Sequence, residues 1–273
     1  MFKRSFILRV LTTLVLLPLT VLLIWAPGLG FFFTLFITTL ACVGVIEYFS
    51  LMRAKEIPAE TLAGVAAATT LAISGHFGSA GFTALLVYAA ILLVATVHVL
   101  RSRLSLEGLV GSAFGPIYVG WFAAHMILLH KIPVTGPGLV TLLLVAVAVT
   151  DAFAYLGGSA FGRHKMAARV SPKKTWEGAA TGFLLTIFAM ALLYALSRRT
   201  GGWPAWTLPR YVLTGAILSV VAQVGDLAES SMKRSAGVKD SGALFPGHGG
   251  VLDRCDGFLF AAPALYYLAA PLF

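Results

Sequence analysis

The sequence predicts an all-α protein, a polytopic integral membrane helix bundle with about nine transmembrane helices of roughly 20 residues each. Of its 273 residues, 59% are hydrophobic and only 11% are charged, and the mean hydropathy is +0.90. Soluble domains are about half apolar and about a quarter charged, so this chain lacks the polar surface that water would require. The apolar runs are continuous rather than alternating, which favours helices over a transmembrane β-barrel.

Each predicted helix is an apolar run of about the length that crosses a bilayer. Turn-forming or charged segments such as "APGLG" and "KIPVTGPG" separate the runs. The helices are expected over residues 6–26, 29–52, 60–76, 80–100, 108–130, 136–158, 177–197, 209–230 and 255–273.

The first helix begins like a signal peptide, because Lys3 and Arg4 precede its apolar stretch. That stretch has about the length of a full span, however, and no small-residue cleavage site follows it before Pro27. We therefore expect the first helix to be retained.

The basic residues predict the orientation in the membrane. If the N-terminus is cytoplasmic, all 20 Lys and Arg except Lys131, Arg198, Arg199 and Arg210 fall on the cytoplasmic side. Such an asymmetry is the positive-inside pattern, and it favours an odd number of spans with the C-terminus outside. The two long basic loops, 159–176 and 231–254, then both face the cytoplasm.

The formal net charge of +9 does not indicate a nucleic-acid partner, because no basic helix stands outside the membrane runs. Positive charge in this setting fixes topology and meets anionic lipid or phosphate. The two cysteines make no disulfide framework.

Carboxylates carry the functional signal, because they contribute little to orientation and are costly in a membrane. Of the 11 acidic residues, most lie in the C-terminal half, namely Asp151, Glu177, Asp226, Glu229, Asp240, Asp253 and Asp256. Carboxylates that converge from neighbouring helices repel one another unless a cation intervenes, and hard oxygen ligands favour Mg²⁺. We expect Asp226 and Asp253 to bind the metal, with Asp256 and Asp151 either as further ligands or as groups that support the ligands; a second cation, divalent or monovalent, stays open.

Cationic and glycine-rich segments accompany these carboxylates. "SPKKT" (171–175) offers two ammonium groups and two hydroxyls, and Lys233, Arg234 and Lys239 offer three more cations. "PGHGG" lets backbone N–H groups approach an anion closely. Together they fit a polyphosphate beside a membrane and favour phosphoryl or nucleotidyl transfer.

Each signal has a simpler interpretation when it is taken alone. "PGHGG" is then only a turn and "SPKKT" only a basic cytoplasmic loop. Glu47, near the cytoplasmic end of the second helix, would simply extend its side chain to the membrane interface. The functional interpretation depends on all of these features coinciding on one side of the membrane.

The segment "SSMKRSAGVKDSGALFPGHGGVLDRCDG" (230–257) resembles the signature of the phosphatidate cytidylyltransferases, also called CDP-diacylglycerol synthases. The Lys-Arg and Lys-Asp pairs, the His-Gly-Gly turn and the final Asp-Arg-x-Asp all stand in register. Cys255 departs mildly from the pattern, because an aliphatic residue or Thr is usual there. "SPKKTWEG" and "VTDAFAYLGG" also resemble family segments.

The resemblance implies Mg²⁺-dependent transfer of CMP from CTP to phosphatidic acid, giving CDP-diacylglycerol and pyrophosphate. It implies catalytic roles for Asp226, Asp253, Asp256, Lys233 and His248. It implies substrate contacts from Ser171, Lys173, Lys174, Thr175, Ser230, Arg234, Lys239, Asp240, Gly249, Gly250 and Arg254. Residues 1–130 would then be a scaffold with lipid and dimer contacts, and 131–273 the catalytic region.

The implied setting is the inner, cytoplasmic membrane, with the active site facing the cytoplasm. CTP, phosphatidic acid and membrane lipid are the expected partners, and a homodimer fits the family. Another CTP-using enzyme that acts on an isoprenoid or ether lipid, or a lipid-alcohol kinase, stays open, because only the apolar acceptor pocket would differ. A CDP-alcohol phosphotransferase is disfavoured, since its D-x2-D-G-x2-A-R motif is absent. An ion-coupled transporter is the alternative from another class.

Overall fold

The computed structural model describes residues 14, 17–101, 104–244 and 249–270. These residues form helices and one small two-stranded sheet. The chain divides into two compact units, which are described separately below. Unit 1 comprises Met1–Lys131 with Met232–Cys255, and unit 2 comprises Ile132–Ser231 with Asp256–Phe273. The segment that carries most of the family signature therefore belongs to the same unit as the N-terminal helices.

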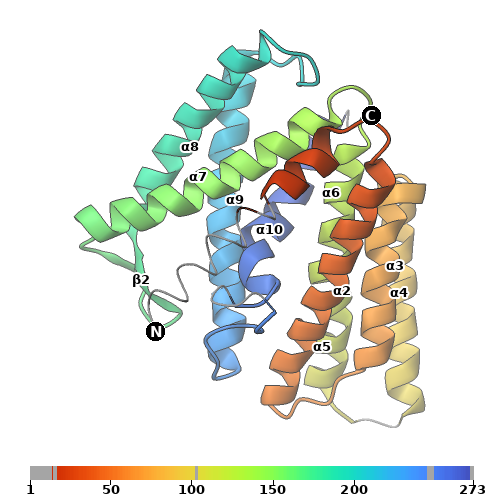
Figure 1. Ribbon diagram of the computed structural model, residues 1–273. Helices are drawn as coiled ribbons and strands as arrows, with labels where there is room; N and C mark the ends of the chain where they lie inside the picture. Colours follow the sequence, from red (N-terminus) through yellow and green to blue (C-terminus); the bar gives the residue numbers. More distant parts are fainter. Residues whose placement is uncertain (1–13, 15–16, 102–103, 245–248, 271–273) are drawn as a thin grey trace. The chain divides into compact units, whose positions relative to one another are not determined.

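Unit 1 is built mainly from helices that follow one another along the chain. After a helical stretch over 17–25, these are α2 (Gly30–Ala54), α3 (Thr61–Phe77), α4 (Ala80–Leu100), α5 (Leu106–Gly115), η1 (Pro116–Trp121) and α6 (Phe122–His130). Helices α2, α3 and α4 lie side by side, with α3 in contact with both of its neighbours (Figure 1). Ser79 and Ser105 cap α4 and α5, because their hydroxyls accept the backbone N–H groups of Phe82 and Gly108.

Helices α5, η1 and α6 form one helical run, and Pro116 opens its π-helical segment. Proline has no N–H to donate and its ring crowds the preceding turn, so a local change of helical pitch at this position has a physical cause. The core of unit 1 contains the fully buried Phe49, Leu71 and Ile127.

Unit 2 begins with α7 (Gly136–Phe161), which leads into a hairpin of β1 (Lys165–Ala167) and β2 (Ser171–Thr175). The strands are antiparallel, pairing Lys165 with Thr175 and Ala167 with Ser171. Helix α8 (Trp176–Ser197) follows the hairpin directly and packs against α7, so β2 lies at one end of the pair (Figure 1). Helices α9 (Leu208–Ser235) and α10 (Leu252–Ala269) start in one unit and end in the other.

Buried hydroxyls connect three helices of unit 2. Thr150 of α7 lies 2.7 Å from Thr186 of α8 and donates to Ser219 of α9 at 3.0 Å, and all three residues are fully buried. Interhelical hydrogen bonds of this kind satisfy polar groups that lipid cannot solvate. They fix the three helices at the level just before Asp151.

Six helical segments in the described part of the chain are long and apolar enough to cross a membrane: Gly30–Ala54, Ala80–Leu100, Leu106–His130, Gly136–Phe161, Trp176–Ser197 and Leu208–Ser235. Helix α3 is apolar but shorter, with 17 residues. An all-helical membrane protein is confirmed, whereas the expected count of nine spans is not. The first predicted helix, 6–26, lies only partly within the described residues, which include 14 and 17–26.

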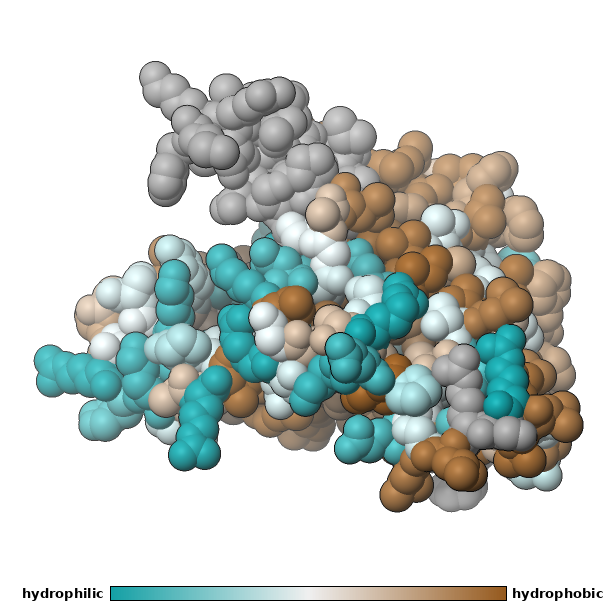
Figure 2. All heavy atoms as spheres, turned by 90° about the horizontal axis from the view of Figure 1, so that it is seen from below, coloured by the Kyte–Doolittle hydropathy of each residue, from teal (hydrophilic) through white to brown (hydrophobic). Residues whose placement is uncertain are grey.

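The surface carries the apolar side chains that lipid contact requires. Large residues such as Leu85, Phe188 and Leu192 are exposed on the spanning helices. Figure 2 shows brown hydrophobic residues at the surface beside a teal hydrophilic area. Without an apolar solvent such exposure would be unfavourable, so the surface agrees with a membrane setting.

Candidate active site

In unit 1, Lys233 and Asp253 form a largely buried ion pair. The Lys233 ammonium donates to Asp253 Oδ1 at 2.5 Å, and the two side chains are 11% and 6% exposed. Lys233 comes from the last turns of α9, and Asp253 from the first turn of α10. A charge pair so far removed from water is costly unless further hydrogen bonds satisfy it.

The second oxygen of Asp253 supplies those hydrogen bonds. Asp253 Oδ2 accepts the backbone N–H of Ser241 at 2.9 Å, its hydroxyl at 3.0 Å and the N–H of Gly250 at 2.8 Å. Burial raises the pKa of the Asp253 carboxyl, but Lys233 and the amides of Gly250 and Ser241 lower it below its ordinary value of 3.8. Asp253 is therefore held as a carboxylate.

Glu47 of α2 reaches the same segment and corrects the sequence-based interpretation of its role. Its carboxylate is buried and accepts hydrogen bonds from the N–H groups of Val251 and Leu252, each at 2.9 Å, and from the Ser241 hydroxyl at 3.0 Å. The prediction that it extends to the membrane interface was wrong. Glu47 instead places a negative charge at the N-terminus of α10, where the helix dipole favours an anion.

The glycines of the signature make room for these carboxylates. Gly249 has a φ of +83°, and a Cβ there would lie 2.5 Å from Asp253 Oδ2. A Cβ at Gly250 would lie 2.3 Å from Glu47 Oε2. The N–H groups of Gly250 and Val251 donate to carboxylates of the protein itself, Asp253 and Glu47, so the predicted contact of this turn with a substrate anion stays a prediction.

Unit 2 holds a second lysine–aspartate pair. Lys174 of β2 forms an ion pair with Asp226 of α9, and both side chains are about a quarter exposed, at 27% and 29%. The Ser230 hydroxyl donates to the other Asp226 oxygen at 3.3 Å, one helical turn further along α9. The structure thus brings together three of the residues that the sequence predicted: Lys174, Asp226 and Ser230.

More carboxylates surround this pair. Asp226, Glu229 and Asp151 are near enough to Asp256 for their negative charges to act on its carboxyl group. Glu229 is fully buried, whereas Asp151 is exposed although it lies in the apolar helix α7. Such a concentration of negative charge needs nearby positive charge, which Lys174 supplies in part.

The carboxylates are the right kind of donor for Mg²⁺, whose preferred ligands are oxygens. Their spacing is looser than a metal site requires. Within residues 17–101, 104–244 and 249–270, no three histidine, cysteine, aspartate or glutamate side chains are grouped closely enough to hold a metal ion. The predicted ligand set of Asp226, Asp253, Asp256 and Asp151 therefore stays a prediction.

The "SPKKT" segment is strand β2 of the hairpin, and its residues have different surroundings. Thr175 is buried and caps α8, accepting the N–H of Gly178 at 3.2 Å. Lys173 is exposed, and Ser171 is half-buried. A role for Thr175 in substrate contact was predicted from its hydroxyl, and the structure already uses that hydroxyl to begin a helix.

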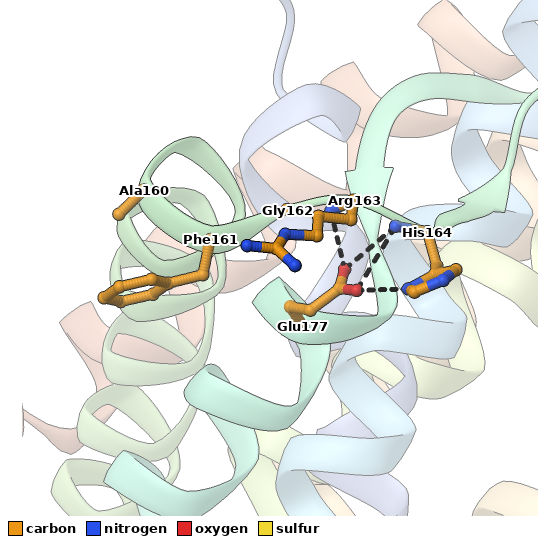
Figure 3. Close-up of a pocket in the computed structure, with 6 residues that line it drawn as sticks. All are labelled: Ala160, Phe161, Gly162, Arg163, His164 and Glu177. Carbon is orange, nitrogen blue, oxygen red and sulfur yellow. Dashed lines mark hydrogen bonds and ion pairs between the residues drawn. The ribbon is translucent and has the colours of Figure 1, made fainter.

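Beside the hairpin lies an open pocket of about 420 Å³, where α7 ends and α8 begins. Its wall includes Phe161, Arg163, His164 and Glu177, and Figure 3 shows the Arg163 side chain between Phe161 and Glu177. The Glu177 carboxylate accepts the N–H groups of Arg163 at 3.0 Å and His164 at 3.2 Å. It also lies 2.5 Å from His164 Nδ1, so it fixes the start of the hairpin to α8.

The remaining predicted residues belong to unit 1 or fall outside the description. Exposed side chains are those of Arg234, Lys239, Asp240 and Arg254. Arg234 donates to the Val238 carbonyl at 3.0 Å, within its own segment. His248, predicted as a catalytic residue, lies outside the described residues.

Sequence reasoning missed Glu47 and His164 as parts of these arrangements. A carboxylate inside an apolar helix is itself a signal of a buried partner, and Glu47 carried that signal. Its partners lie 194 to 205 residues away, so no local pattern could identify them. His164 had no comparable signal, because a histidine in a basic loop is ordinary.

Comparison with known proteins identifies the family. The model of the cytidylyltransferase family matches residues 7–272. The chain is 37% identical to a phosphatidate cytidylyltransferase of Brucella abortus over 265 residues, covering 97% of this chain and 93% of that protein. It is 32% identical to one from Synechocystis over 89% of this chain and 90% of the relative, and 30% identical to one from Bacillus subtilis over 84% and 86%. This chain therefore belongs to the cytidylyltransferase family, and it is a nucleotidyltransferase.

Proposed function

We propose that this protein transfers CMP from CTP to phosphatidic acid, giving CDP-diacylglycerol and pyrophosphate with Mg²⁺ as the metal. The observation that carries the proposal is the similarity to phosphatidate cytidylyltransferases along nearly the whole chain. The two lysine–aspartate pairs support it, because both involve signature or "SPKKT" residues. The active site would face the cytoplasm, where CTP is available.

The reaction is a displacement at phosphorus. A phosphate oxygen of phosphatidic acid forms a bond to the α-phosphorus of CTP, while the bond from that phosphorus to the β-bridging oxygen breaks. Pyrophosphate leaves with the electron pair. The attacking phosphate monoester is already anionic near neutral pH, so the reaction needs charge neutralisation and positioning more than a strong base.

The cationic side chains would provide that neutralisation. Lys174 and Lys233 are each held by an aspartate, and the exposed Lys173 and Lys239 are accessible to a nucleotide. We assign these four lysines to CTP and lipid phosphates. Charge-assisted hydrogen bonds to phosphate are among the stronger polar contacts, which suits the binding of a tetra-anionic nucleotide.

A Mg²⁺ ion would be held by carboxylates, of which Asp226, Asp256 and Asp151 in unit 2 share one electrostatic environment. When bound, the ion would polarise the phosphoryl oxygens and neutralise developing charge. The protein's own contribution is to orient these carboxyl groups. Asp226 is oriented from two sides, by Lys174 and by Ser230.

The decisive experiment is incubation of purified protein with CTP, phosphatidic acid and Mg²⁺, with CDP-diacylglycerol and pyrophosphate both measured. We expect the two products in equal amounts and none after chelation of the metal. Parallel reactions would contain an isoprenoid phosphate, an ether-linked phosphatidic acid analogue or a lipid alcohol. Preferred turnover of the isoprenoid phosphate or the ether-linked analogue would refute phosphatidic acid as the substrate while keeping the enzyme class, whereas phosphorylation of the lipid alcohol with release of CDP would refute nucleotidyl transfer.

A further inference from the structure

The buried contact between Glu47 and the signature segment goes beyond the proposed chemistry. Glu47 belongs to α2, whereas Ser241, Val251 and Leu252 lie in the segment that contains Asp253. We propose that Glu47 is a positioning residue, which holds Ser241, Val251 and Leu252 so that Asp253 faces Lys233.

Three hydrogen bonds carry this inference. The Glu47 carboxylate accepts the N–H of Val251, the residue just before α10, and the N–H of Leu252, the first residue of α10, which has no partner within the helix. Its third hydrogen bond comes from the Ser241 hydroxyl, whose single hydrogen is shared between Glu47 Oε2 and Asp253 Oδ2. Ser241 therefore links the positioning carboxylate to the signature carboxylate, with 3.0 Å on each side.

Two glycines show that the space around Glu47 is built for its carboxylate. A Cβ at Gly242 would lie 2.3 Å from Glu47 Oε1, and one at Gly250 would lie 2.3 Å from Oε2. Real Cβ atoms do not approach so closely, so a side chain at either position would displace the carboxylate. Neither glycine has a positive φ, so the requirement for glycine here comes from the close approach of Glu47.

The N-terminus of α10 is consequently not a free anion site. Helix N-termini commonly bind phosphate, but here a side chain of the protein occupies the position. The Glu47 carboxylate thus takes the place that a phosphate group would otherwise occupy at these N–H groups. The substrate phosphates are left to the lysines.

The first test compares Glu47→Gln with the wild type and with Glu107→Gln, which makes the same chemical change at an exposed site. The amide nitrogen of Gln cannot accept the N–H groups, so we expect kcat to fall by about ten- to a hundredfold in the folded, monodisperse fraction. A purely structural role would lower the yield of folded protein and leave kcat per folded molecule unchanged. Wild-type kcat in Glu47→Gln would overturn the proposal.

The second test uses the glycine contact. In the wild-type background Gly242→Ala should lower kcat, because its Cβ displaces the Glu47 carboxylate. In a Glu47→Ala background the same substitution should lower kcat by at most about a further twofold, because the carboxylate is already absent. Gly201→Ala is the control, since a Cβ there meets nothing within 4 Å. Additive losses from Gly242→Ala and Glu47→Ala would contradict the inferred contact.

A third readout does not depend on activity. Trypsin cleavage after Lys239 and Arg254 should be at least about tenfold faster in Glu47→Gln than in Glu107→Gln, because the segment opens locally more often. The kinetic tests rest on the proposed function, whereas this one does not. Failure of the wild type to use CTP would refute the proposed function. Equal cleavage rates in Glu47→Gln and Glu107→Gln would refute the positioning role of Glu47.

Discussion

At the scale of single residues, lysine balances two of the predicted metal-binding aspartates, Asp253 and Asp226. Lys233 neutralises Asp253 in nearly complete burial, whereas Lys174 neutralises Asp226 in partial contact with water. The two pairs therefore differ in what their loss should cost. Removing one partner of a buried pair leaves an uncompensated charge, whereas water screens the exposed pair.

We predict that Asp253→Asn abolishes CTP-dependent product formation and lowers the free energy of unfolding by about 3–5 kcal/mol. Lys233 would then be a buried cation without its main counter-charge. The double variant Lys233→Met/Asp253→Asn should recover most of the stability and none of the activity. Thermal unfolding in detergent and the product assay, run on the same samples, separate the two effects.

Asp226→Asn should abolish turnover while changing the unfolding midpoint little, because its side chain is partly solvated. Lys174→Ala tests the other side of this pair and should weaken CTP binding, seen as a higher KM. Near-normal turnover in both Asp226→Asn and Asp253→Asn would remove the basis for their assignment to the catalytic site.

The pH dependence of stability follows from the lowered pKa of Asp253. A carboxyl whose pKa is lower in the folded state contributes stability above its ordinary value of 3.8, and loses it as the pH falls through the folded value. The difference in unfolding midpoint between the wild type and Asp253→Asn should therefore shrink below pH 3.8. A difference that grows on acidification would contradict the assigned direction.

At the scale of elements, small residues bring α7 and α8 together and so place the hairpin that carries Lys174. A Cβ at Gly178 would lie 2.5 Å from the Ala154 carbonyl oxygen, and one at Gly182 would lie 2.6 Å from that of Thr150. Small residues that permit such close approach are typical of membrane helix pairs. The α7–α8 pair thereby determines the position of β2, which precedes α8 directly.

Gly178→Leu should separate the two helices, lower the stability by about 1–3 kcal/mol and reduce turnover by moving β2. Ala180→Leu is the matched control, because Ala180 is exposed on the same helix. Unfolding midpoints and product formation would be measured for both. Equal unfolding midpoints and equal product formation in the two variants would show that the close packing of α7 and α8 contributes neither to stability nor to turnover.

The elements were largely predictable, and their long-range partners were not. Apolar runs and turn residues placed helices close to 30–54, 80–100 and 136–161, because hydropathy and chain breaks are local properties. The sequence also singled out Asp226, Lys174 and Ser230. It did not reveal that Glu47 meets Val251, since that pairing depends on how the helices pack and not on any spacing.

At the scale of the whole molecule, the distribution of basic residues predicts the topology. Single cysteines in a background without Cys42 and Cys255 would test it with a membrane-impermeant maleimide. We expect labelling of Lys173→Cys only from the cytoplasmic side and of Thr200→Cys only from the opposite side. Labelling of both from one side would refute the orientation.

The Glu47 contact also has a consequence for biosynthesis. Val251 leaves the ribosome 204 residues after Glu47, so α2 is made long before its partners exist. Until Val251 has been made, the Glu47 side chain lies in or beside the bilayer without its final hydrogen bonds, which is unfavourable in free energy. A nascent chain that stops before Val251 would keep this group exposed, and proteolytic quality control could distinguish it from the finished protein. This contact therefore forms late in synthesis, because it requires residue 251.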